Sequence, residues 1–203
     1  MTAIVDYGVG NLFSLSSSLA AIGEEAAVTR DRGEIAAADR VILPGVGAFA
    51  DARRKLAETG MDEAVLAAAE GGKPLLGICL GMQLLFERSC EYGEHAGLAL
   101  LRGEVVGMAG RIPPELPIPH IGWNALDIRR PGGILKYVKS GDCVYFVHSY
   151  YAEGCEESLT VTAEYGLPLA ACVSLGNVHG CQFHPEKSGK VGLSILKAFC
   201  ELR

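Results

Sequence analysis

The sequence predicts an α/β protein with an open, mostly parallel twisted sheet, flanking helices, and antiparallel additions in the C-terminal half. Two observations lead to this prediction. Short apolar runs alternate with segments of helical spacing over the first hundred residues, and glycine-containing turns join them. After about Gly103 the apolar runs are shorter and turn residues separate them, as is typical of antiparallel strands. With 203 residues and no long linker, the chain is expected to form a single domain over residues 1–203.

The parallel half repeats one unit, a buried strand followed by a turn and a helix. Its expected strands are Ala3–Val5, Val41–Leu43 and Leu75–Ile78. Its expected helices are Leu12–Ile22, a stretch through Leu56, and Asp62–Ala69. The C-terminal half has six strand candidates: Val105-Val106, Ala125–Ile128, Val144–Val147, Leu159–Ala163, Leu169–Val173 and Val178–Phe183. A closing helix over Val191–Cys200 presents one apolar stripe that should pack on the sheet.

The composition excludes several classes of function. Hydrophobic residues make up 49% of the chain, which is enough to form a core and excludes global disorder. The net charge of −6 argues against a nucleic-acid partner. Apolar runs stay short of the roughly 20 residues that span a bilayer, and Arg30 is the first basic residue, so we expect a cytoplasmic protein without a membrane partner. The seven cysteines include no C-x-x-C pair, which indicates reduced thiols and no metal.

The segment Gly77-Ile78-Cys79-Leu80-Gly81 is the most informative part of the chain. It follows an apolar run and precedes a helical pattern, so it has the form of a nucleophile elbow with cysteine as the nucleophile. A sharp strand-to-helix turn brings its flanking backbone so close that glycine is needed two residues before and after the nucleophile. The helix N-terminus favours a thiolate and can receive an oxyanion. A small buried cysteine between two glycines is the structural alternative for Cys79.

Two other segments supply candidate partners for this thiol. His184-Pro185-Glu186 follows a strand candidate, and Pro185 should keep the segment extended, with His184 and Glu186 on similar sides. A carboxylate beside an imidazole fixes its tautomer, and the imidazole can then assist the thiol. Pro44-Gly45-Val46-Gly47 ends a buried strand, and its two glycines would let peptide groups reorient and present N–H groups to an oxyanion.

Taken together, GICLGMQLLFE at residues 77–87 and QFHPE at residues 182–186 resemble the class I (triad) glutamine amidotransferases, and the resemblance covers nearly the whole chain. Within that class, five further segments are similar to the glutaminase subunits of imidazole glycerol phosphate synthases. They are GVGN at 8–11, PGVGAF at 44–49, PHIGWN at 119–124, YFVHSY at 145–150 and FHPEKS at 183–188.

The resemblance implies a role for each matching residue. Cys79 would be the nucleophile, His184 the general acid and base, and Glu186 the group that orients it. Backbone N–H groups of Leu80 and Val46, the latter between Gly45 and Gly47, would hold the oxyanion. A glutamine pocket and a partner interface are implied as well. Their residues would be Gln83, His148, Ser149 and Tyr150 for glutamine, and Gly10, Asn11, Trp123 and Lys187 for the partner.

The implied reaction is the hydrolysis of glutamine through a Cys79 thioester, without a cofactor, with the ammonia passing to a cyclase subunit of (β/α)8 barrel fold in a heterodimer. That cyclase would make imidazole glycerol phosphate in histidine biosynthesis. Two alternatives remain open. One is a glutaminase subunit of another amidotransferase, serving pyridoxal phosphate or aminobenzoate synthesis. The other is a non-catalytic regulatory module of the same fold.

Overall fold

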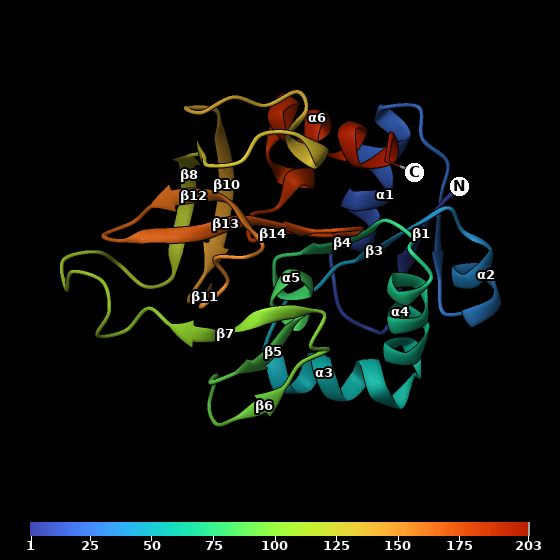
Figure 1. The fold of residues 1–203 in the computed structure, drawn as a ribbon, viewed down its shortest axis with the longest axis horizontal. Coiled ribbons are helices and arrows are strands. Elements are labelled where there is room, and N and C mark those ends of the chain that lie inside the picture. Colours follow the sequence, from blue (N-terminus) through green and yellow to red (C-terminus); the bar gives the residue numbers. More distant parts are fainter. Residues whose placement is uncertain (203) are drawn as a thin grey trace.

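A computed structural model describes residues 1–202, and an eight-stranded sheet forms its centre (Figure 1). The strand order is β2-β1-β3-β4-β14-β13-β12-β9. The first five strands are parallel, whereas β13, β12 and β9 continue the sheet in antiparallel pairs. This arrangement confirms the predicted fold class. In chain order the strands are β1 (Thr2–Val5), β2 (Ala26–Thr29), β3 (Arg40–Leu43), β4 (Leu75–Ile78), β9 (Asp127–Ile128), β12 (Leu159–Glu164), β13 (Pro168–Leu175) and β14 (Val178–Cys181).

Helices cover both faces of this sheet, and each face has its own apolar core. α1 and α6 lie on one face, while α3, α4 and α5 lie on the other (Figure 1). Leu15 and Leu19 of α1 pack with Phe199 of α6 in one core, and Phe49 of α3 packs with Val65 of α4 in the other. The helices are α1 (Leu12–Ala21), α2 (Arg32–Ala37), α3 (Phe49–Glu58), α4 (Met61–Glu70), α5 (Leu80–Leu84) and α6 (Gly189–Cys200).

Two smaller sheets extend the C-terminal half and form the far side of the site. One has the order β11-β7-β5-β6, and the other pairs β10 with β8 in antiparallel register. Two short 3-10 helices, η1 (Gly133–Leu135) and η2 (Pro185–Lys187), complete the fold. The strands are β5 (Phe86–Ser89), β6 (His95–Ala96), β7 (Leu101–Gly107), β8 (His120–Ala125), β10 (Cys143–His148) and β11 (Tyr150–Glu153).

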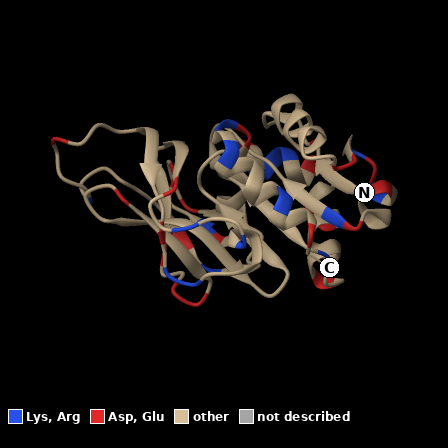
Figure 2. Cartoon of the chain, turned by 90° about the horizontal axis from the view of Figure 1, so that it is seen from above, with Lys and Arg blue, Asp and Glu red and all other residues tan. Residues whose placement is uncertain are grey.

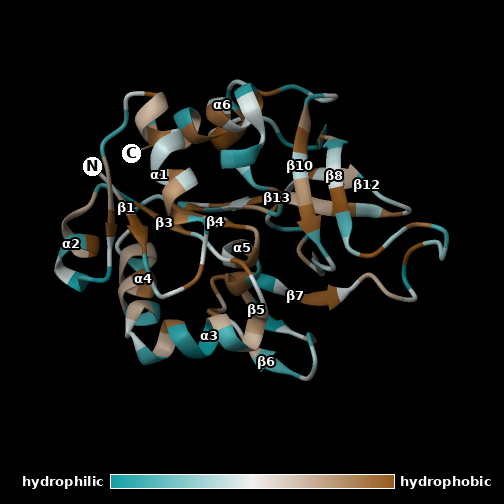
Figure 3. Cartoon of the chain, turned by 180° about the vertical axis from the view of Figure 1, so that it is seen from behind, coloured by the Kyte–Doolittle hydropathy of each residue, from teal (hydrophilic) through white to brown (hydrophobic). Residues whose placement is uncertain are grey.

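Hydrophobic residues gather in the central layer of the fold, and hydrophilic residues lie on the outside of the helices. The central strands and α5 are hydrophobic in Figure 3, whereas α3 shows hydrophilic residues on its outer turns. Figure 2 shows basic and acidic segments interspersed over the ribbon. Within residues 1–202, no helix is long and apolar enough to cross a bilayer. All seven cysteines are free thiols.

The structure contains two early elements that the sequence did not predict, β2 and α2. β2 is an edge strand whose residues Ala26–Thr29 are only partly buried, so their apolar signal is weak. α2 is a six-residue helix whose N-cap, Asp31, accepts a hydrogen bond from the backbone N–H of Glu34 at 2.9 Å. Both elements lie at the margin of the sheet, where they bury few apolar side chains and so leave a weak pattern in the sequence.

Candidate active site

Cys79 lies at a strained turn between β4 and α5. Its backbone has φ 55° and ψ −111°, and its N–H donates to the carbonyl of Cys181 on the neighbouring β14 at 2.8 Å. A Cβ on Gly81 would lie 1.9 Å from the carbonyl oxygen of Leu43, and one on Gly77 would lie 2.7 Å from the backbone nitrogen of Met82. Both glycines are therefore required by close backbone approach, as the elbow predicts. Leu80 starts α5, so its N–H has no partner within the helix.

His184 and Glu186 reach the same place from the end of β14. Because β14 runs parallel to β4 at the next position in the sheet, their carboxyl ends meet at one edge. Nδ1 of His184 lies 2.8 Å from Oε1 of Glu186, and both side chains are 3% exposed. The expectation of an extended segment is wrong beyond His184. Pro185–Lys187 forms the 3-10 helix η2, because proline suits a first helical position and only restricts the residue before it.

The electrostatics of His184 favour the imidazolium. Burial lowers the pKa of this imidazole, but hydrogen bonds to Cys79 and Glu186 and their negative charges outweigh it. The net effect raises the pKa of His184 to about 9. A cationic imidazole beside Cys79 is the environment in which a thiolate forms. The three residues therefore form a connected thiol, imidazole and carboxylate.

A cavity of about 610 Å³ opens in front of the sulfur, and Cys79 and His184 line it. Its wall also contains Gln83 from α5, Val46 and Gly47 from the strand end, and the backbone turn His148-Ser149-Tyr150 between β10 and β11. The four residues predicted for glutamine binding are thus all in the wall. Of the residues predicted for the oxyanion hole, Leu80, Val46 and Gly47 line the cavity and Gly45 does not. In residues 1–202, no group of three or more metal-ligating side chains is arranged to hold a metal ion.

Gln83 and His148 face the cavity, yet much of their hydrogen-bonding capacity is used within the protein. Nε2 of Gln83 donates to the carbonyl of Tyr150 at 3.1 Å and to Oε1 of Gln182 at 3.0 Å. Nδ1 of His148 donates to the same Tyr150 carbonyl at 2.8 Å, and its Nε2 lies 3.1 Å from Nδ1 of His120. Both ring nitrogens of His148 are thus engaged, so its backbone, and not its ring, is available to a ligand.

The segment Pro44-Gly45-Val46-Gly47 passes beside the elbow, and its two glycines differ. A Cβ on Gly45 would lie 2.7 Å from the backbone nitrogen of Gly81, so Gly45 is packed tightly. Gly47 has φ +95°, and a Cβ on it would have nothing within 4 Å. The sequence predicted conformational freedom at both glycines. The open space at Gly47 leaves room for such a change, whereas Gly45 serves close approach to the elbow.

Two functional candidates at this segment were not found from the sequence. The hydroxyl of Tyr7, which is buried, donates to the carbonyl of Pro44 at 2.7 Å. Oε2 of Glu91 accepts from the backbone N–H of Phe49, the first residue of α3, at 2.5 Å, and Glu91 also lines the cavity. They hold the two ends of the segment. Tyr7 precedes a glycine-rich turn, which was a usable signal, whereas nothing local marks Glu91.

The first pair of predicted interface residues lies on the β8 and η2 side of the cavity. Trp123 is 59% exposed, which excludes a core role. Its ring packs edge to face with Tyr145, with 6.2 Å between the ring centroids. Nζ of Lys187 lies 6.0 Å from the centroid of the same Tyr145 ring. Trp123 and Lys187 therefore flank one tyrosine at the rim of the site.

The second pair lies on the α1 side. Gly10 has φ +120°, and a Cβ there would lie 3.2 Å from the side chain of Pro44. The turn that contains Gly10 therefore packs on the start of the Pro44–Gly47 segment. Asn11 shares a small hollow with His184 and Glu186. Lys187 and Asn11 thus share hollows with His184, whereas Trp123 and Gly10 lie further out, against Tyr145 and Pro44.

Comparison with known proteins gives a consistent result at the level of sequence. The family model described as glutamine amidotransferase class-I matches residues 3–201. A protein of Caldanaerobacter subterraneus named imidazole glycerol phosphate synthase subunit HisH is 51% identical over 203 residues, covering 100% of this chain and 98% of the relative. A relative of the same name from Moorella thermoacetica is 52% identical over 201 residues, covering 98% of this chain and 94% of that protein.

Solved structures agree in fold. A crystal structure of a glutamine amidotransferase matches with a TM-score of 0.75 at 21% identity, covering 98% of each chain. The structure of PurLQS from Thermotoga maritima matches with a TM-score of 0.74 at 19% identity, covering 98% of this chain and 96% of that one. Since the family model spans almost every residue and the relatives are about half identical over their full length, the chain belongs to the class-I glutamine amidotransferase family.

Proposed function

We propose that the chain is the glutaminase subunit of an imidazole glycerol phosphate synthase. The observation that carries the proposal is the connected thiol, imidazole and carboxylate of Cys79, His184 and Glu186. Cys79 and His184 line a cavity large enough for an amino acid. The relatives that share about half of its residues carry the name of that subunit. Residues with these contacts suit nucleophilic attack on an amide.

The proposed reaction has two stages that balance as glutamine plus water giving glutamate, ammonia and a proton. In the first stage the sulfur of Cys79 attacks the side-chain amide carbon, and the protonated His184 gives its proton to the departing nitrogen, which leaves as ammonia. A glutamyl thioester remains. In the second stage His184 takes a proton from water, the hydroxide attacks the thioester, the Cys79 thiolate leaves, and the new carboxyl group gives its proton to the solvent as glutamate departs. Glu186 keeps the imidazole in the required orientation.

Each tetrahedral stage places a negative charge on the former amide oxygen. The N–H of Leu80 at the start of α5 supplies one donor, and the N–H of Val46 supplies the second when the Gly45–Gly47 segment turns it toward the thiol. Gln83 and the backbone of Ser149 and Tyr150 bind the amino-acid end of glutamine. Among the described residues that line the cavity, Glu91 has the single carboxylate, and it suits the substrate's ammonium group.

The ammonia is proposed to pass to a cyclase subunit of (β/α)8 barrel fold, bound in a heterodimer. Asn11 and Lys187 share hollows with His184, and Gly10 and Trp123 lie beside them, against Pro44 and Tyr145. Trp123 is an exposed aromatic side chain of the kind that anchors interfaces. The segment packed against Gly10 is the one that must supply the Val46 donor. Docking is therefore expected to raise glutaminase activity. Seven free thiols fit a reducing compartment, so we place the reaction in the cytoplasm.

The decisive experiment is Cys79→Ala in the complex with the cyclase. Glutamate release and glutamine-dependent cyclisation should fall to background, while added ammonium salts still support the cyclase. Cys90→Ala is the matched control, because that thiol is exposed and lies outside the cavity lining. Glutamate release retained in Cys79→Ala would refute the nucleophile. A wild-type complex that releases no glutamate would favour the non-catalytic module instead.

The partner is tested separately. Glutamate release is measured for the chain alone, for the complex, and for the complex with the cyclase ligand bound, and we expect the rate to rise at each step. Equal rates in all three samples would refute activation by the partner. Stable binding to an acceptor enzyme of another pathway, without binding to the cyclase, would assign the chain to a different amidotransferase.

A further inference from the structure

Gln182 is a buried residue beside Cys79 that neither the elbow nor the triad accounts for. It follows β14 directly, its side chain is 0% exposed, and its N–H donates to the carbonyl of Ala171 on β13 at 2.9 Å. Gln182 is not among the residues that line the cavity in front of the sulfur. Its side-chain nitrogen lies 3.7 Å from the sulfur of Cys79. It therefore contacts the nucleophile from behind, away from the substrate.

The orientation of this amide follows from one backbone carbonyl. The carbonyl of Tyr150 can only accept hydrogen bonds, so the group of Gln83 that faces it at 3.1 Å must be the NH2 group. The second hydrogen of that NH2 group reaches Gln182 at 3.0 Å, so the oxygen of Gln182 must face Gln83. The remaining group of Gln182, its own NH2, then points at Cys79. The donor and acceptor at each hydrogen bond are thus fixed from the carbonyl of Tyr150, through Gln83 and Gln182, to the sulfur.

A second chain of contacts holds the Tyr150 carbonyl in place. Nδ1 of His148 donates to it at 2.8 Å, which makes Nε2 of His148 an acceptor for Nδ1 of His120 at 3.1 Å. Nδ2 of Asn124 lies 3.3 Å from the remaining nitrogen of His120. Burial lowers the pKa of His120 to about 4 and that of His148 to about 3, so both rings stay neutral at physiological pH. At that pH, the hydrogen bonds that the two histidines make therefore keep the same donors and acceptors.

We propose that Gln182 is a positioning residue that presents a fixed amide N–H to the sulfur of Cys79 and favours its thiolate. The inference rests on the proposed function, in which that thiolate is the nucleophile. A hydrogen bond donated to an anion favours the charged form, and a dipole that is already oriented needs no rearrangement when the charge forms. Gln182 thus adds a neutral donor to the charged imidazole of His184, whose pKa Cys79 helps to raise.

The test replaces Gln182 by two residues of similar length. Gln182→Met removes both polar groups, and Gln182→Glu keeps an acceptor for Gln83 but places oxygen where the N–H was. Alkylation of the full chain by iodoacetamide is followed against pH, and the Cys79 peptide is quantified by mass spectrometry. We expect the midpoint of the Cys79 profile to rise by about one pH unit in Gln182→Met and by more in Gln182→Glu, as loss of a hydrogen bond to an anion requires.

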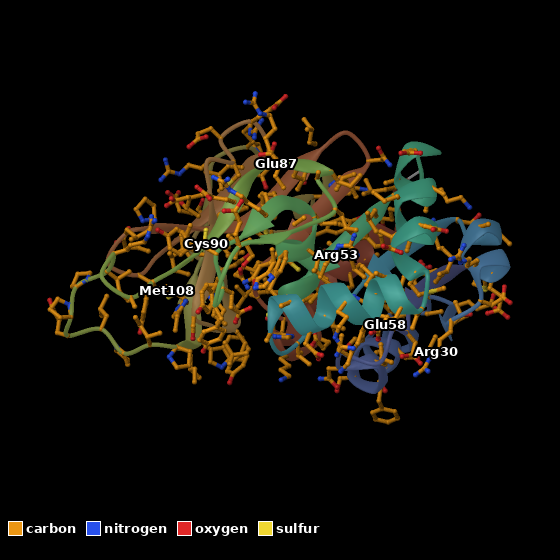
Figure 4. All side chains as sticks on the ribbon, turned by 90° about the horizontal axis from the view of Figure 1, so that it is seen from below. Arg30, Arg53, Glu58, Glu87, Cys90 and Met108 are labelled. Atoms are coloured by element: carbon orange, nitrogen blue, oxygen red, sulfur yellow. The ribbon has the colours of Figure 1, made fainter. Side chains whose placement is uncertain are left out.

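The same sample contains its own control. Cys90, labelled in Figure 4, is exposed, lies outside the cavity lining and has its thiol 3.7 Å from Oε2 of Glu104 on β7, so its profile should not move. The other titratable groups near the sulfur, His184, Glu186, Tyr7 and Cys181, are unchanged in both variants. In the complex, kcat for glutamate release should fall about tenfold in both variants. KM should stay unchanged in Gln182→Glu, because Gln182 does not line the cavity and this variant keeps the acceptor for Gln83.

A merely structural role predicts a lower unfolding temperature with an unmoved Cys79 midpoint, and that result would overturn the proposal. If both variants fail to fold, a measurement on the wild-type chain still tests the role of Gln182. The side-chain amide signal of Gln182 in a nitrogen-15 NMR spectrum must shift as Cys79 titrates, and a signal that stays constant contradicts the inference. This outcome is separable from failure of the proposed function, which is measured by glutamate release in Cys79→Ala.

Discussion

The two glycine-containing segments on either side of the sulfur use glycine for different reasons. At the elbow, Gly77 and Gly81 have no room for a Cβ, because backbone atoms of neighbouring elements lie 2.7 Å and 1.9 Å from where it would be. At Gly47 there is open space, but φ is +95°. The elbow is closely packed, and in the other segment Pro44 and Gly45 are packed too, whereas Val46 and Gly47 are open. The nucleophile is thus held by its neighbours, while space is left at Val46 for the proposed oxyanion donor to turn.

The largest effect is expected from Gly81→Ala. The new methyl group would collide with the carbonyl of Leu43, so β3 and α5 must move apart. We expect the free energy of unfolding to fall by about 3 kcal/mol or more, and glutaminase activity in the complex to be lost. Urea unfolding and glutamate release measure the two effects. Wild-type stability in Gly81→Ala would show that the elbow is looser than the contacts imply.

Gly47→Ala should separate fold from function. A Cβ fits there, but the positive φ disfavours alanine, so the stability loss is expected to stay near 1 to 2 kcal/mol. If the peptide can no longer present the Val46 N–H, glutamate release in the complex should drop about 10²- to 10³-fold. Gly176→Ala is the matched control, since Gly176 has φ +57°, equally open space, and a place in the distant β13–β14 turn. Equal activity losses in the two variants would contradict the role of Gly47.

The same contrast explains what the sequence could predict. β4, Cys79 and α5 were predicted because their signals are local: an apolar run, two glycines at fixed spacing, and helical periodicity. His184 and Glu186 were found because they are two residues apart. Glu91 was missed because its partner, the N–H of Phe49, is 42 residues away, and only the packing of the small sheet against α3 brings them together.

Local patterns also misjudged some conformations. The Pro185 rule restricts His184, which is extended, but it allows the 3-10 turn that follows. The role of Gly45 was assigned to peptide flexibility because a glycine in a turn looks the same whether it needs φ freedom or close approach. Only the neighbours in space, here the backbone of Gly81, distinguish the two.

Tyr7→Phe probes the anchored end of the flexible segment and should have a smaller effect. It removes the hydroxyl that donates to the Pro44 carbonyl at 2.7 Å and leaves that buried acceptor unpaired, at a cost of about 1 kcal/mol. Glutamate release in the complex should fall several-fold as the segment loses its fixed start. Tyr137→Phe is the control, because that hydroxyl bonds Glu201 at the surface. An unaltered rate in Tyr7→Phe would mean that the anchor does not position the oxyanion donor.

The smallest effect distinguishes two histidines near the ends of β14. Burial lowers the pKa of His179 to about 4, whereas the pKa of His184 is raised to about 9. In the unfolded chain both titrate near the ordinary value of about 6.5. A lowered folded pKa means that stability is lost as the pH falls below about 6.5. A raised folded pKa means that the histidine's contribution to the free energy of unfolding is fully present below about pH 6.5 and is lost as the pH rises through about 9.

Between about pH 7 and pH 6, each histidine therefore changes the free energy of unfolding by roughly half a kcal/mol, and the two changes are opposite in sign. Relative to wild type over that interval, His179→Gln should gain stability on acidification and His184→Gln should lose it. Urea unfolding at both pH values gives the difference directly, with His95→Gln in the partly exposed β6 as the control. Changes of the same sign in the two variants would show that the elbow does not hold His184 as a cation while β14 holds His179 neutral.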